Sequence, residues 1–441
     1  MIREARLLRM AYSGALGARV VGSYKLLSLQ RSRHSDEEYA RRLARLHEQN
    51  AEALYNAVIR LQGLMIKIGQ TIGSRPDVFP AEYVRVLGRL QDRVPPRRWD
   101  IMRPHIEKQL GAPIASIFAE FDPEPVAAAS LAQVYRARLK DGRDVAVKVI
   151  YPGMGRLVRS DLSILRGITW LESRFFAFPL DPVYEELKAN IPNEVDMLKE
   201  AQHMDGLRRT LAHRPEIVIP GVVHEHTTKR VLVMEYIDGV KISDLEGLKR
   251  AGIDQVKVFT LLADVYFEKM LIHGYFQADP HPGNLLALPG NRLALLDFGL
   301  TKRFTPEFRR GFKQTTRAIF RSDNAGVAAG MRACGFRFTD EDPEPVIALA
   351  EFFRTMSDPD TYADRDLMQA VSEAWVQAFR RHPMSEMPGE IALAMRVFGL
   401  LFGLGATVGG DLGMPRDAIS SAALKYAERP ELLEPELAAA S

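Results

Sequence analysis

The sequence predicts an α+β fold of two lobes with helices ahead of the first lobe. Apolar residues recur at helical spacing through residues 35–74, where no proline interrupts them. Apolar, β-branched runs at 144–149 and 230–239 indicate strands, whereas the pattern after about Val240 is again mostly helical. We therefore divide the chain into a basic amphipathic helical segment at 1–50, a helical extension at 51–121, a mixed lobe at 122–240 and a helical lobe at 241–441.

The composition is that of an ordinary folded protein. The 441 residues are 46% hydrophobic and 26% charged, and a formal net charge of +3 does not predict nucleic acid as a partner. Cys334 is the only cysteine, which excludes an internal disulfide and any multi-cysteine metal site. The most apolar stretch, residues 397–410, is shorter than the roughly 18 to 20 residues that a membrane span needs.

The first 33 residues interleave basic side chains with leucines and valines, and Glu4 is their one acidic residue. A segment of this kind can lie on an anionic lipid surface. It can equally pack its apolar stripe against the rest of the protein, and the sequence leaves both interpretations open. The basic residues are Arg3, Arg6, Arg9, Arg19, Lys25, Arg31 and Arg33.

The predicted helix at 35–74 carries Lys67, Gly69 and Gln70 among apolar residues. This setting suggests polar groups turned inward, where a buried ammonium needs a carboxylate partner. A lysine here can also reach solvent along its own stem, which is the more common fate of such residues. A further short helix is predicted at 101–121.

A hairpin is predicted from residues 127–149, with its turn at Asp141 and Gly142. The second strand reads valine, alanine, valine, lysine, as does the kinase strand whose lysine neutralises the α- and β-phosphates of a nucleotide. Lys148 is our candidate for that role; the alternative is a lysine at the solvent end of an edge strand. The first strand begins with an alanine-rich stretch made of Ala127, Ala128, Ala129 and Ser130.

A kinase lysine of this type pairs with a glutamate from a following helix, and the chain offers Glu194, Asp196 and Glu200. On one continuous helix Glu194 and Glu200 would lie about 120° apart, so we expect them to serve different cations. The available cations are Lys67 and Lys148, and the alternative is a solvated acidic face. The strand at 230–239 would end at a hinge, where Glu235 and Ile237 would hold adenine through the backbone.

The spacing of Asp279, Asn284 and Asp297 is that of a kinase catalytic loop and its metal-binding turn. Asp279 would orient or deprotonate the attacking hydroxyl or water. Asn284 and Asp297 would supply hard oxygen ligands for the Mg²⁺ that bridges the phosphates of ATP. Either motif alone is common in loops and turns, but their order and spacing together favour the catalytic interpretation.

With these motifs, the chain resembles the UbiB/AarF family of atypical kinase-like ATPases, which support ubiquinone biosynthesis in bacteria and mitochondria. The resemblance implies a bilobal protein-kinase-like fold in which the helix bearing Lys67 folds over the place where a protein kinase accepts its peptide. The matching features run from about 61 to 302: the Lys-x-Gly-Gln helix at Lys67 to Gln70, the alanine loop at Ala127 to Ser130, Lys148, the pair Glu194 and Asp196, Glu200, Asp279, Asn284 and Asp297.

The sequence departs from the family pattern at several points. Gln277 stands where many members have histidine, which affects the hydrogen bonding behind the catalytic loop. Ala278 precedes Asp279 in place of arginine, so phosphorylation of an activation loop has no anchor there. The segment after Gly299 contains no Ala-Pro-Glu platform for a protein substrate, and the chain ends without the pair of transmembrane helices found in many bacterial members.

The resulting interpretation is an ATP- and Mg²⁺-binding enzyme that hydrolyses ATP or phosphorylates a small, lipidic molecule. The expected partners are ATP, that acceptor and the surface of a membrane, in a cytoplasmic protein or one held peripherally at the inner membrane. One alternative is a nucleotide-binding pseudokinase whose conformational change is its product. Another is a small-molecule kinase of the aminoglycoside type, which shares the spacing of Asp279 and Asn284 but is disfavoured by the Lys67 helix and the alanine loop.

Overall fold

The computed structural model divides the chain into two compact units. The first comprises Met1–Glu200 and Val222–Tyr236, and the second comprises Ala201–Gly221 and Ile237–Ser441. The structure describes residues 6–73, 79–91, 96–172, 184–185, 188, 191, 193–339, 342–357, 365–382, 384–386, 388–409 and 418–430. The chain leaves the first unit inside helix α9 (Met197–Thr210) and again after Tyr236, next to the predicted hinge.

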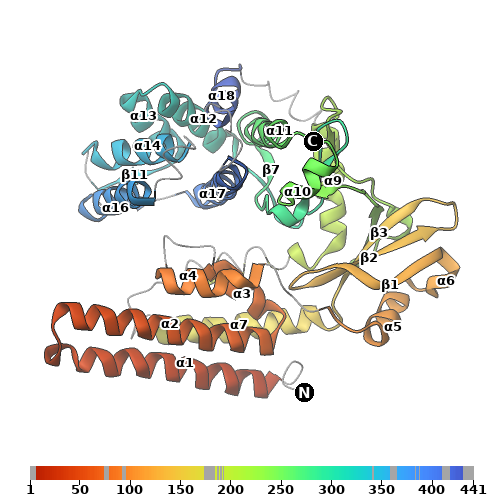
Figure 1. Cartoon of the computed structure of the whole chain (residues 1–441), viewed down its shortest axis with the longest axis horizontal. Helices are drawn as coiled ribbons and strands as arrows, with labels where there is room; N and C mark the ends of the chain where they lie inside the picture. The colour runs from red at the N-terminus through yellow and green to blue at the C-terminus, as the bar shows by residue number, and fades with distance from the viewer. Residues whose placement is uncertain are drawn as a thin grey trace. The chain divides into compact units, whose positions relative to one another are not determined.

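Helices at the amino-terminal end of the first unit pack side by side (Figure 1). They are α1 (Arg6–Leu29), α2 (Asp36–Leu61), α3 (Leu64–Gly73), α4 (Ala81–Gly88) and α7 (Met154–Glu172), with short 3-10 turns at η1 (Arg31–Arg33) and η2 (Arg89–Gln91). Ser35 caps α2, because its side chain accepts a hydrogen bond from the Glu38 amide at 3.2 Å.

The prediction of one helix through 35–74 is wrong, because the helix breaks between α2 and α3. Gln62 and Gly63 at the break have φ angles of 54° and 66°, in the left-handed region. A Cβ on Gly63 would lie 2.6 Å from Leu157 Cδ2 of α7, so a larger residue would have to move that side chain as well as adopt an unfavourable backbone angle. Ser74, the predicted end of the helix, lies outside the described residues.

Arg9 of α1 is fully buried in an ion pair with Asp161 of α7. Its Nε and Nη2 atoms donate to the two carboxylate oxygens at 3.0 and 2.6 Å, and Nη1 donates to the Leu61 carbonyl at 2.6 Å. Burial raises the pKa of Asp161 to about 6, although Arg9 acts in the opposite direction. Arg9 therefore joins two helices and is not available to a lipid surface.

The first unit also holds an antiparallel sheet in the order β1-β2-β3-β5. Its strands are β1 (Phe118–Ala128), β2 (Ala132–Leu139), β3 (Asp144–Ile150) and β5 (Val231–Glu235). The predicted hairpin is present as β2 and β3, but its first strand begins at Ala132, because Ala127 and Ala128 belong to the end of β1 and a turn follows them. The predicted helix at 101–121 is wrong at its end: α5 (Trp99–Leu110) stops at Gly111, whose φ is 71°, and after α6 (Ile114–Ile117) the first strand already begins at Phe118.

The second unit is mostly helical. Its helices are α10 (Leu245–Arg250), α11 (Gln255–Glu268), the π-helix η4 (Lys269–His273), α12 (Pro306–Phe320), α13 (Asn324–Cys334), α14 (Glu344–Ser357), α16 (Arg365–Arg381), α17 (Gly389–Gly409) and α18 (Ala418–Ala427). Among the residues described, no helix combines the length and the apolar character needed to cross a bilayer.

Short strands in the second unit carry the predicted catalytic loops. One sheet has the order β4-β9-β8-β6, from β4 (Ile217–Val218), β9 (Arg292–Leu295), β8 (Leu285–Leu288) and β6 (Val240–Lys241). A second pairs β7 (Tyr275–Gln277) with β10 (Thr301–Arg303), and a third pairs β11 (Arg337–Phe338) with β12 (Met384–Glu386). The 3-10 turn η5 (Pro282–Asn284) leads into β8.

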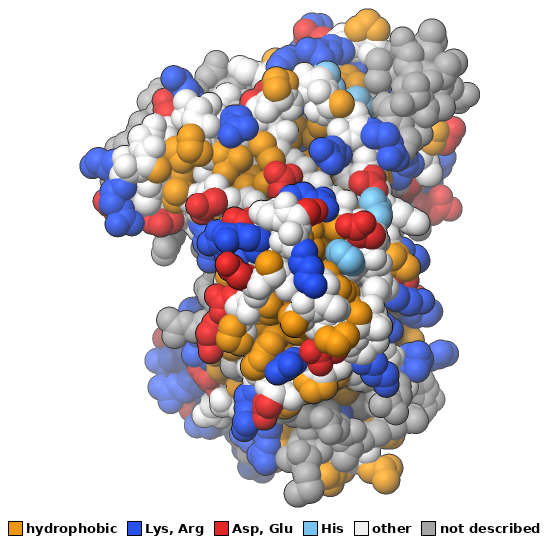
Figure 2. Space-filling model, turned by 90° about the vertical axis from the view of Figure 1, so that its right-hand side faces the viewer, with side chains coloured by type: hydrophobic (Ala, Val, Ile, Leu, Met, Phe, Trp, Pro, Cys, Tyr) orange, Lys and Arg blue, Asp and Glu red, His pale blue; other side chains and the backbone are white. Residues whose placement is uncertain are grey.

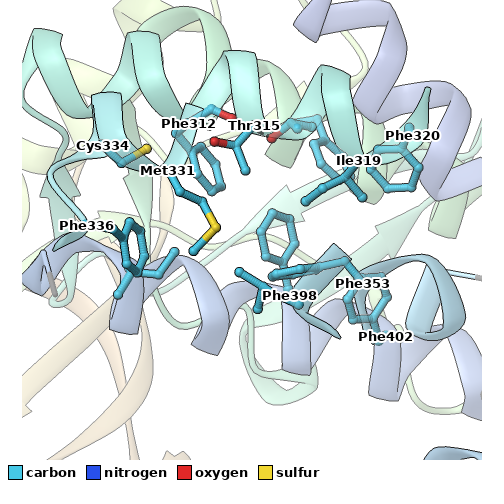
Figure 3. A pocket seen from close by; sticks show the side chains of 14 residues that line it. Phe312, Thr315, Ile319, Phe320, Met331, Cys334, Phe336, Phe353, Phe398 and Phe402 are labelled. Carbon is cyan, nitrogen blue, oxygen red and sulfur yellow. Dashed lines mark hydrogen bonds between the residues drawn. The ribbon is translucent and has the colours of Figure 1, made fainter. Parts of the chain in front are cut away.

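An apolar cavity of about 30 Å³ lies among α12, α13, α14 and α17 of the second unit (Figure 3). Phenylalanines such as Phe312 and Phe398 line it, together with Met331 and Cys334. Burial raises the pKa of the Cys334 thiol to about 12, so this thiol stays protonated. Because a cavity that accepts benzene measures about 150 Å³, this one is a packing void with no room for an aromatic ring.

Charged side chains of both signs are interspersed on the face of the molecule in Figure 2. Hydrophobic side chains lie between them over much of this face, and Lys and Arg side chains are more frequent toward its lower right edge. This mixture agrees with the small formal net charge of +3.

Candidate active site

Lys148 and Glu200 form a close ion pair in the first unit. Lys148 Nζ donates to Glu200 Oε1 at 2.7 Å, and both side chains are largely shielded from water. Lys148 lies on β3, between β2 and β5, where it pairs with Val134 on one side and Leu232 on the other. It is therefore not at the solvent end of an edge strand, and Glu200 in the first turn of α9 holds its ammonium in place.

The alanine-rich stretch is the end of one strand and the start of a tight turn. Ala127 and Ala128 pair with β2, and the Ala129 amide donates to the Ala132 carbonyl at 2.8 Å. The Tyr151 hydroxyl, which the sequence did not single out, donates to the Ala129 carbonyl at 3.1 Å. Ser130 is buried, and none of residues 127–131 has a positive φ angle. The turn is thus tied down in conformations that alanine adopts easily.

Lys67 on α3 pairs with Glu194, with Nζ 3.0 Å from Oε1 and both side chains mostly buried. Glu194 and Glu200 do serve different cations, but Val195 is in a turn and Asp196 is in neither helix nor strand, so the two glutamates do not share one continuous helix. Asp196 lies 3.6 Å from Lys229 Nζ and accepts a hydrogen bond from the Leu198 amide at the start of α9.

Gly69 and Gln70 fix the helix that carries Lys67. A Cβ on Gly69 would lie 2.4 Å from Leu90 Cδ1, so glycine lets α3 approach this neighbour without displacing the Leu90 side chain. Gln70 Nε2 donates to the Leu90 carbonyl at 2.9 Å and joins α3 to η2. The Lys-x-Gly-Gln pattern therefore combines the ion pair of Lys67 with two residues, Gly69 and Gln70, that hold α3 close to η2.

We predict that Ala128→Gly increases ATP affinity several-fold or permits autophosphorylation, and that Lys67→Ala has a similar effect by removing the pair with Glu194. Glycine reaches backbone angles that alanine avoids at a cost of roughly 1 kcal/mol or more, so the turn could then close over phosphates. ATP and ADP affinities and phosphate incorporation are measured in both variants, with Ala132→Gly on β2 as the matched control. Unchanged values in both variants would show that the alanines are ordinary strand residues.

The second unit brings Asn284 and Asp297 to the same end of the β8–β9 hairpin. Leu285 pairs with Leu295, and the Leu296 amide donates to the Asn284 carbonyl at 3.0 Å, so Asp297 follows directly. Asp297 Oδ1 accepts a hydrogen bond from the Gly299 amide at 3.0 Å. Both side chains are partly exposed and offer hard oxygen donors. This donor set fits Mg²⁺, which prefers one or two protein oxygens and keeps its remaining positions for water and phosphate.

The turn after Asp297 is anchored from two sides. His203 Nδ1 lies 3.1 Å from the Phe298 carbonyl, so this nitrogen carries the proton and donates it. The Thr301 hydroxyl donates to the same carbonyl at 2.8 Å. Phe298 itself is fully buried. His203 and Thr301 are thus supporting residues that motif spacing alone did not identify.

Gln277 connects the catalytic loop to the turn at Asp297. Its Nε2 donates to the Asp297 carbonyl at 3.1 Å, while its Oε1 accepts from Lys269 Nζ at 2.9 Å. Lys269 is fully buried, with Nζ 3.4 Å from the centre of the Tyr266 ring. Burial holds the pKa of Lys269 well below its usual value, against the effect of Glu268. The glutamine that departs from the family pattern is therefore a bridge between a buried lysine and the predicted metal-binding turn.

We expect Lys269→Met to lower the free energy of unfolding by about 1–3 kcal/mol, because the side-chain oxygen Oε1 of Gln277 would lose its hydrogen-bond donor inside the protein. A double-mutant cycle with Gln277→Leu, followed by denaturant unfolding, measures the coupling. The double variant should be no less stable than Lys269→Met alone. Additive losses would contradict a direct coupling between these two side chains.

Arg396 contacts the predicted catalytic Asp279, and the sequence analysis did not single it out. Its Nη2 lies 3.0 Å from Asp279 Oδ2, and both side chains are about three-quarters buried. Glu390 and Arg396 are the only charged residues in α17, an otherwise apolar helix. The sequence could have pointed to Arg396, because a lone arginine within an apolar helix needs a partner for its charge. The Ala278 amide, which donates to the Leu300 carbonyl at 2.8 Å, holds the loop behind Asp279.

The predicted hinge residues lie on either side of the boundary between the two units. Glu235 is the last residue of β5, is exposed and pairs with Val145 of β3. The Tyr236 amide donates to the Asp144 carbonyl at 3.1 Å, and Ile237 begins the second unit. The first unit thus holds Lys148, Glu200 and the alanine turn, and the second holds Asp279, Asn284 and Asp297.

Comparison with known proteins finds a matching family model, curated relatives and a similar solved structure. Residues 89–331 match the model of the ABC1 atypical kinase-like domain. The chain is 34% identical over 281 residues to a probable protein kinase UbiB of Marinobacter nauticus, covering 62% of this chain and 51% of that one. It is 33% identical over 349 residues to the chloroplastic protein ACTIVITY OF BC1 COMPLEX KINASE 8 of Arabidopsis thaliana, covering 76% of this chain and 45% of that one.

The chain therefore spans about half the length of these two relatives. Among solved structures, the complex of Rv3197 with erythromycin from Mycobacterium tuberculosis is similar with a TM-score of 0.55. The two share 22% identity, and the similarity covers 85% of this chain and 95% of that one. At this identity the likeness concerns the fold, which is kinase-like with an amino-terminal helical region.

Proposed function

This chain belongs to the UbiB/AarF family of ABC1 atypical kinase-like proteins, and we propose that it binds ATP with Mg²⁺ and hydrolyses the nucleotide or transfers its γ-phosphoryl group to a small, lipidic acceptor. The observation that carries this proposal is the pair of Lys148 and Glu200 at 2.7 Å. A lysine held in this way on a central strand is typical of kinases that position nucleotide phosphates.

Each proposed role follows from the surroundings of the residue. Lys148 would neutralise the α- and β-phosphates, and Glu200 keeps its ammonium oriented. Asn284 and Asp297 would hold Mg²⁺, which supplies charge neutralisation at the phosphates when bound. Asp279 would orient or deprotonate the attacking hydroxyl or water, and Arg396 at 3.0 Å fixes the direction of its carboxylate.

Two features support a small acceptor over a protein. No Ala-Pro-Glu platform follows Gly299 in the sequence. In addition, the family resemblance implies that the helix bearing Lys67 covers the place where a protein kinase accepts its peptide. The ion pair of Lys67 and Glu194 anchors this helix, α3, to the segment that leads into α9, which also carries Glu200. Family resemblance to proteins that support ubiquinone biosynthesis makes prenylated phenols the first acceptors to test.

Phosphate release by the purified full chain tests the proposal. ATP turnover is measured with and without anionic liposomes and with prenylphenol mimics, while labelled ATP reports transfer to the acceptor. Turnover that requires Asp279 supports the enzyme. ATP binding without turnover under every lipid condition would instead support a nucleotide-binding pseudokinase.

Contact of α1 with a membrane surface is a second proposal, favoured by the exposed apolar side chains of this helix. Leu7, Leu26 and Leu29 are 80%, 60% and 71% exposed, and Leu8 and Met10 are also exposed. Arg19 and Lys25 of α1 are exposed as well, whereas Arg9 is buried. Leucines beside basic residues favour peripheral binding to anionic lipid.

We predict that the full chain co-sediments with anionic liposomes and that binding falls as salt is added. Each basic residue near an anionic surface contributes about 1 kcal/mol, so Arg19→Gln with Lys25→Gln should weaken binding about tenfold or more. Leu26→Gln with Leu29→Gln should weaken it as well. Arg41→Gln with Arg42→Gln on α2 is the matched control for charge. Liposome binding that does not change with salt concentration, or no binding at all, would contradict the proposal.

A further inference from the structure

A cluster of two histidines and a glutamate lies behind the catalytic loop in the second unit. His213 Nε2 is 2.6 Å from Glu268 Oε1, and His273 Nε2 is 3.6 Å from the same oxygen. The three atoms that could act as ligands all lie within 4.8 Å of one another. None of these residues belongs to the proposed nucleotide site. From this geometry we infer that His213, Glu268 and His273 form a binding site for a divalent transition-metal ion of the zinc class.

The buried ring of His273 is a second indication of a bound ligand. Its side chain is 9% exposed, and neither ring nitrogen makes a hydrogen bond to any residue that the structure describes. Buried polar atoms in proteins nearly always have a partner, and an exception needs an explanation. A metal ion bound to Nε2 satisfies one of the two nitrogens directly, and neutral imidazole is the form that binds metals.

The π-helix η4 places His273 beside Glu268. In an α-helix residues five apart are separated by about 140° around the axis. A π-turn closes between residues five apart, as in the bond from the Gly274 amide to the Lys269 carbonyl. The widened turn therefore brings Glu268 and His273 to one side, although their spacing in sequence does not suit an α-helix. Such π-turns occur frequently at functional sites.

Glu268 is already oriented by groups that support its role as a ligand. Its Oε2 accepts a hydrogen bond from Arg214, and the Tyr426 hydroxyl, which donates to Asp264 at 2.8 Å, lies 3.3 Å from the same Oε2, which leaves Oε1 directed toward the two histidines. Arg214 also pairs with Asp264 and Glu216. Partners behind a ligand that fix its orientation are typical of metal sites.

The donor set favours zinc over magnesium. Two imidazoles and one carboxylate form one of the ligand sets of zinc sites that keep a fourth position for water. Bond lengths near 2.0–2.2 Å place tetrahedral ligand atoms about 3.3–3.6 Å apart. The separation of 3.6 Å from His273 matches this, and the 2.6 Å hydrogen bond from His213 must lengthen. The His213 side chain is 51% exposed and can make that adjustment.

Cobalt and zinc binding to the full chain tests the inference. Chelator-treated protein is titrated with Co²⁺, whose visible absorption reports a four-coordinate site, and Zn²⁺ affinity is measured against a chromophoric chelator. We expect one ion per chain and a loss of about tenfold or more in affinity for His213→Ala and for His273→Ala. Zn²⁺ should raise the thermal midpoint of the wild type but not of these variants. Because His213 is exposed, its replacement leaves the core intact, and equal circular dichroism spectra check this.

His382→Ala is the matched control, because His382 lies beside Asp342 and Glu344 in another group of potential ligands. Asp297→Asn controls for Zn²⁺ at the proposed magnesium site. Retention of binding in both controls is expected. Equal affinity in wild type and His213→Ala would overturn the inference, as would binding lost only with His382→Ala or Asp297→Asn, or no saturable binding in the wild type.

Discussion

Replacing Asp279 with asparagine should lower ATP turnover by about 100-fold or more while ATP affinity stays within a few-fold. Asparagine has nearly the same shape and can still accept the hydrogen bond that Arg396 donates at 3.0 Å. The variant therefore removes the negative charge and the basicity of the side chain but preserves the contact that orients it. A loss of this size is typical when a positioned base is removed.

Steady-state phosphate release and equilibrium ATP binding are measured in parallel on the wild type and on Asp279→Asn. Asp254→Asn is the matched control, since this carboxylate caps α11 in the same unit through the Lys257 amide and has no proposed catalytic role. Its turnover should remain close to that of the wild type. Equal turnover in Asp279→Asn and the wild type would exclude Asp279 as the base.

Asp297→Asn should abolish the Mg²⁺-dependent part of ATP binding. The Gly299 amide can still donate to the side chain of the variant, so the turn keeps its shape while the charged ligand is lost. A ligand at 100 times its Kd adds about 2.7 kcal/mol to the free energy of unfolding, and a 100-fold loss of affinity reduces this to about 0.4 kcal/mol. The expected change is therefore large enough for a thermal-shift measurement.

The measurement compares ATP with Mg²⁺ against ATP with a chelator, in the wild type and in the variant. Stabilisation by ATP without the metal should be similar in both proteins. Asp323→Asn, which changes the cap of α13, controls for a general loss of stability. Undiminished Mg²⁺-dependent stabilisation of Asp297→Asn would show that Asp297 is not a metal ligand.

The motifs and the resemblance they carry were enough to predict the kinase-like fold and the family, and local patterns predicted the helical character of the second unit. The hairpin that carries Lys148, the run into Asp297 and the helical character after Val240 are set by residues close together in sequence. Alternation, turn residues and helical periodicity act over short distances, so they can be read without a structure. The helix predicted through 35–74 breaks at Gln62 and Gly63, whose φ angles of 54° and 66° are not helical, and at this break Gly63 lies against Leu157, which is distant in sequence.

By itself, the sequence determined which residues are candidates for the chemistry: Lys148, Glu200, Asp279, Asn284 and Asp297. Only the tertiary structure decided which residues support them. The bond from Arg396 to Asp279 spans 117 positions in the chain, and the pair of Arg9 and Asp161 spans 152. A buried charge selects its partner by proximity in space, because the cost of leaving it unpaired does not depend on separation along the chain. Motifs can therefore name the reacting groups, while the groups that hold them in place become visible only in the folded chain.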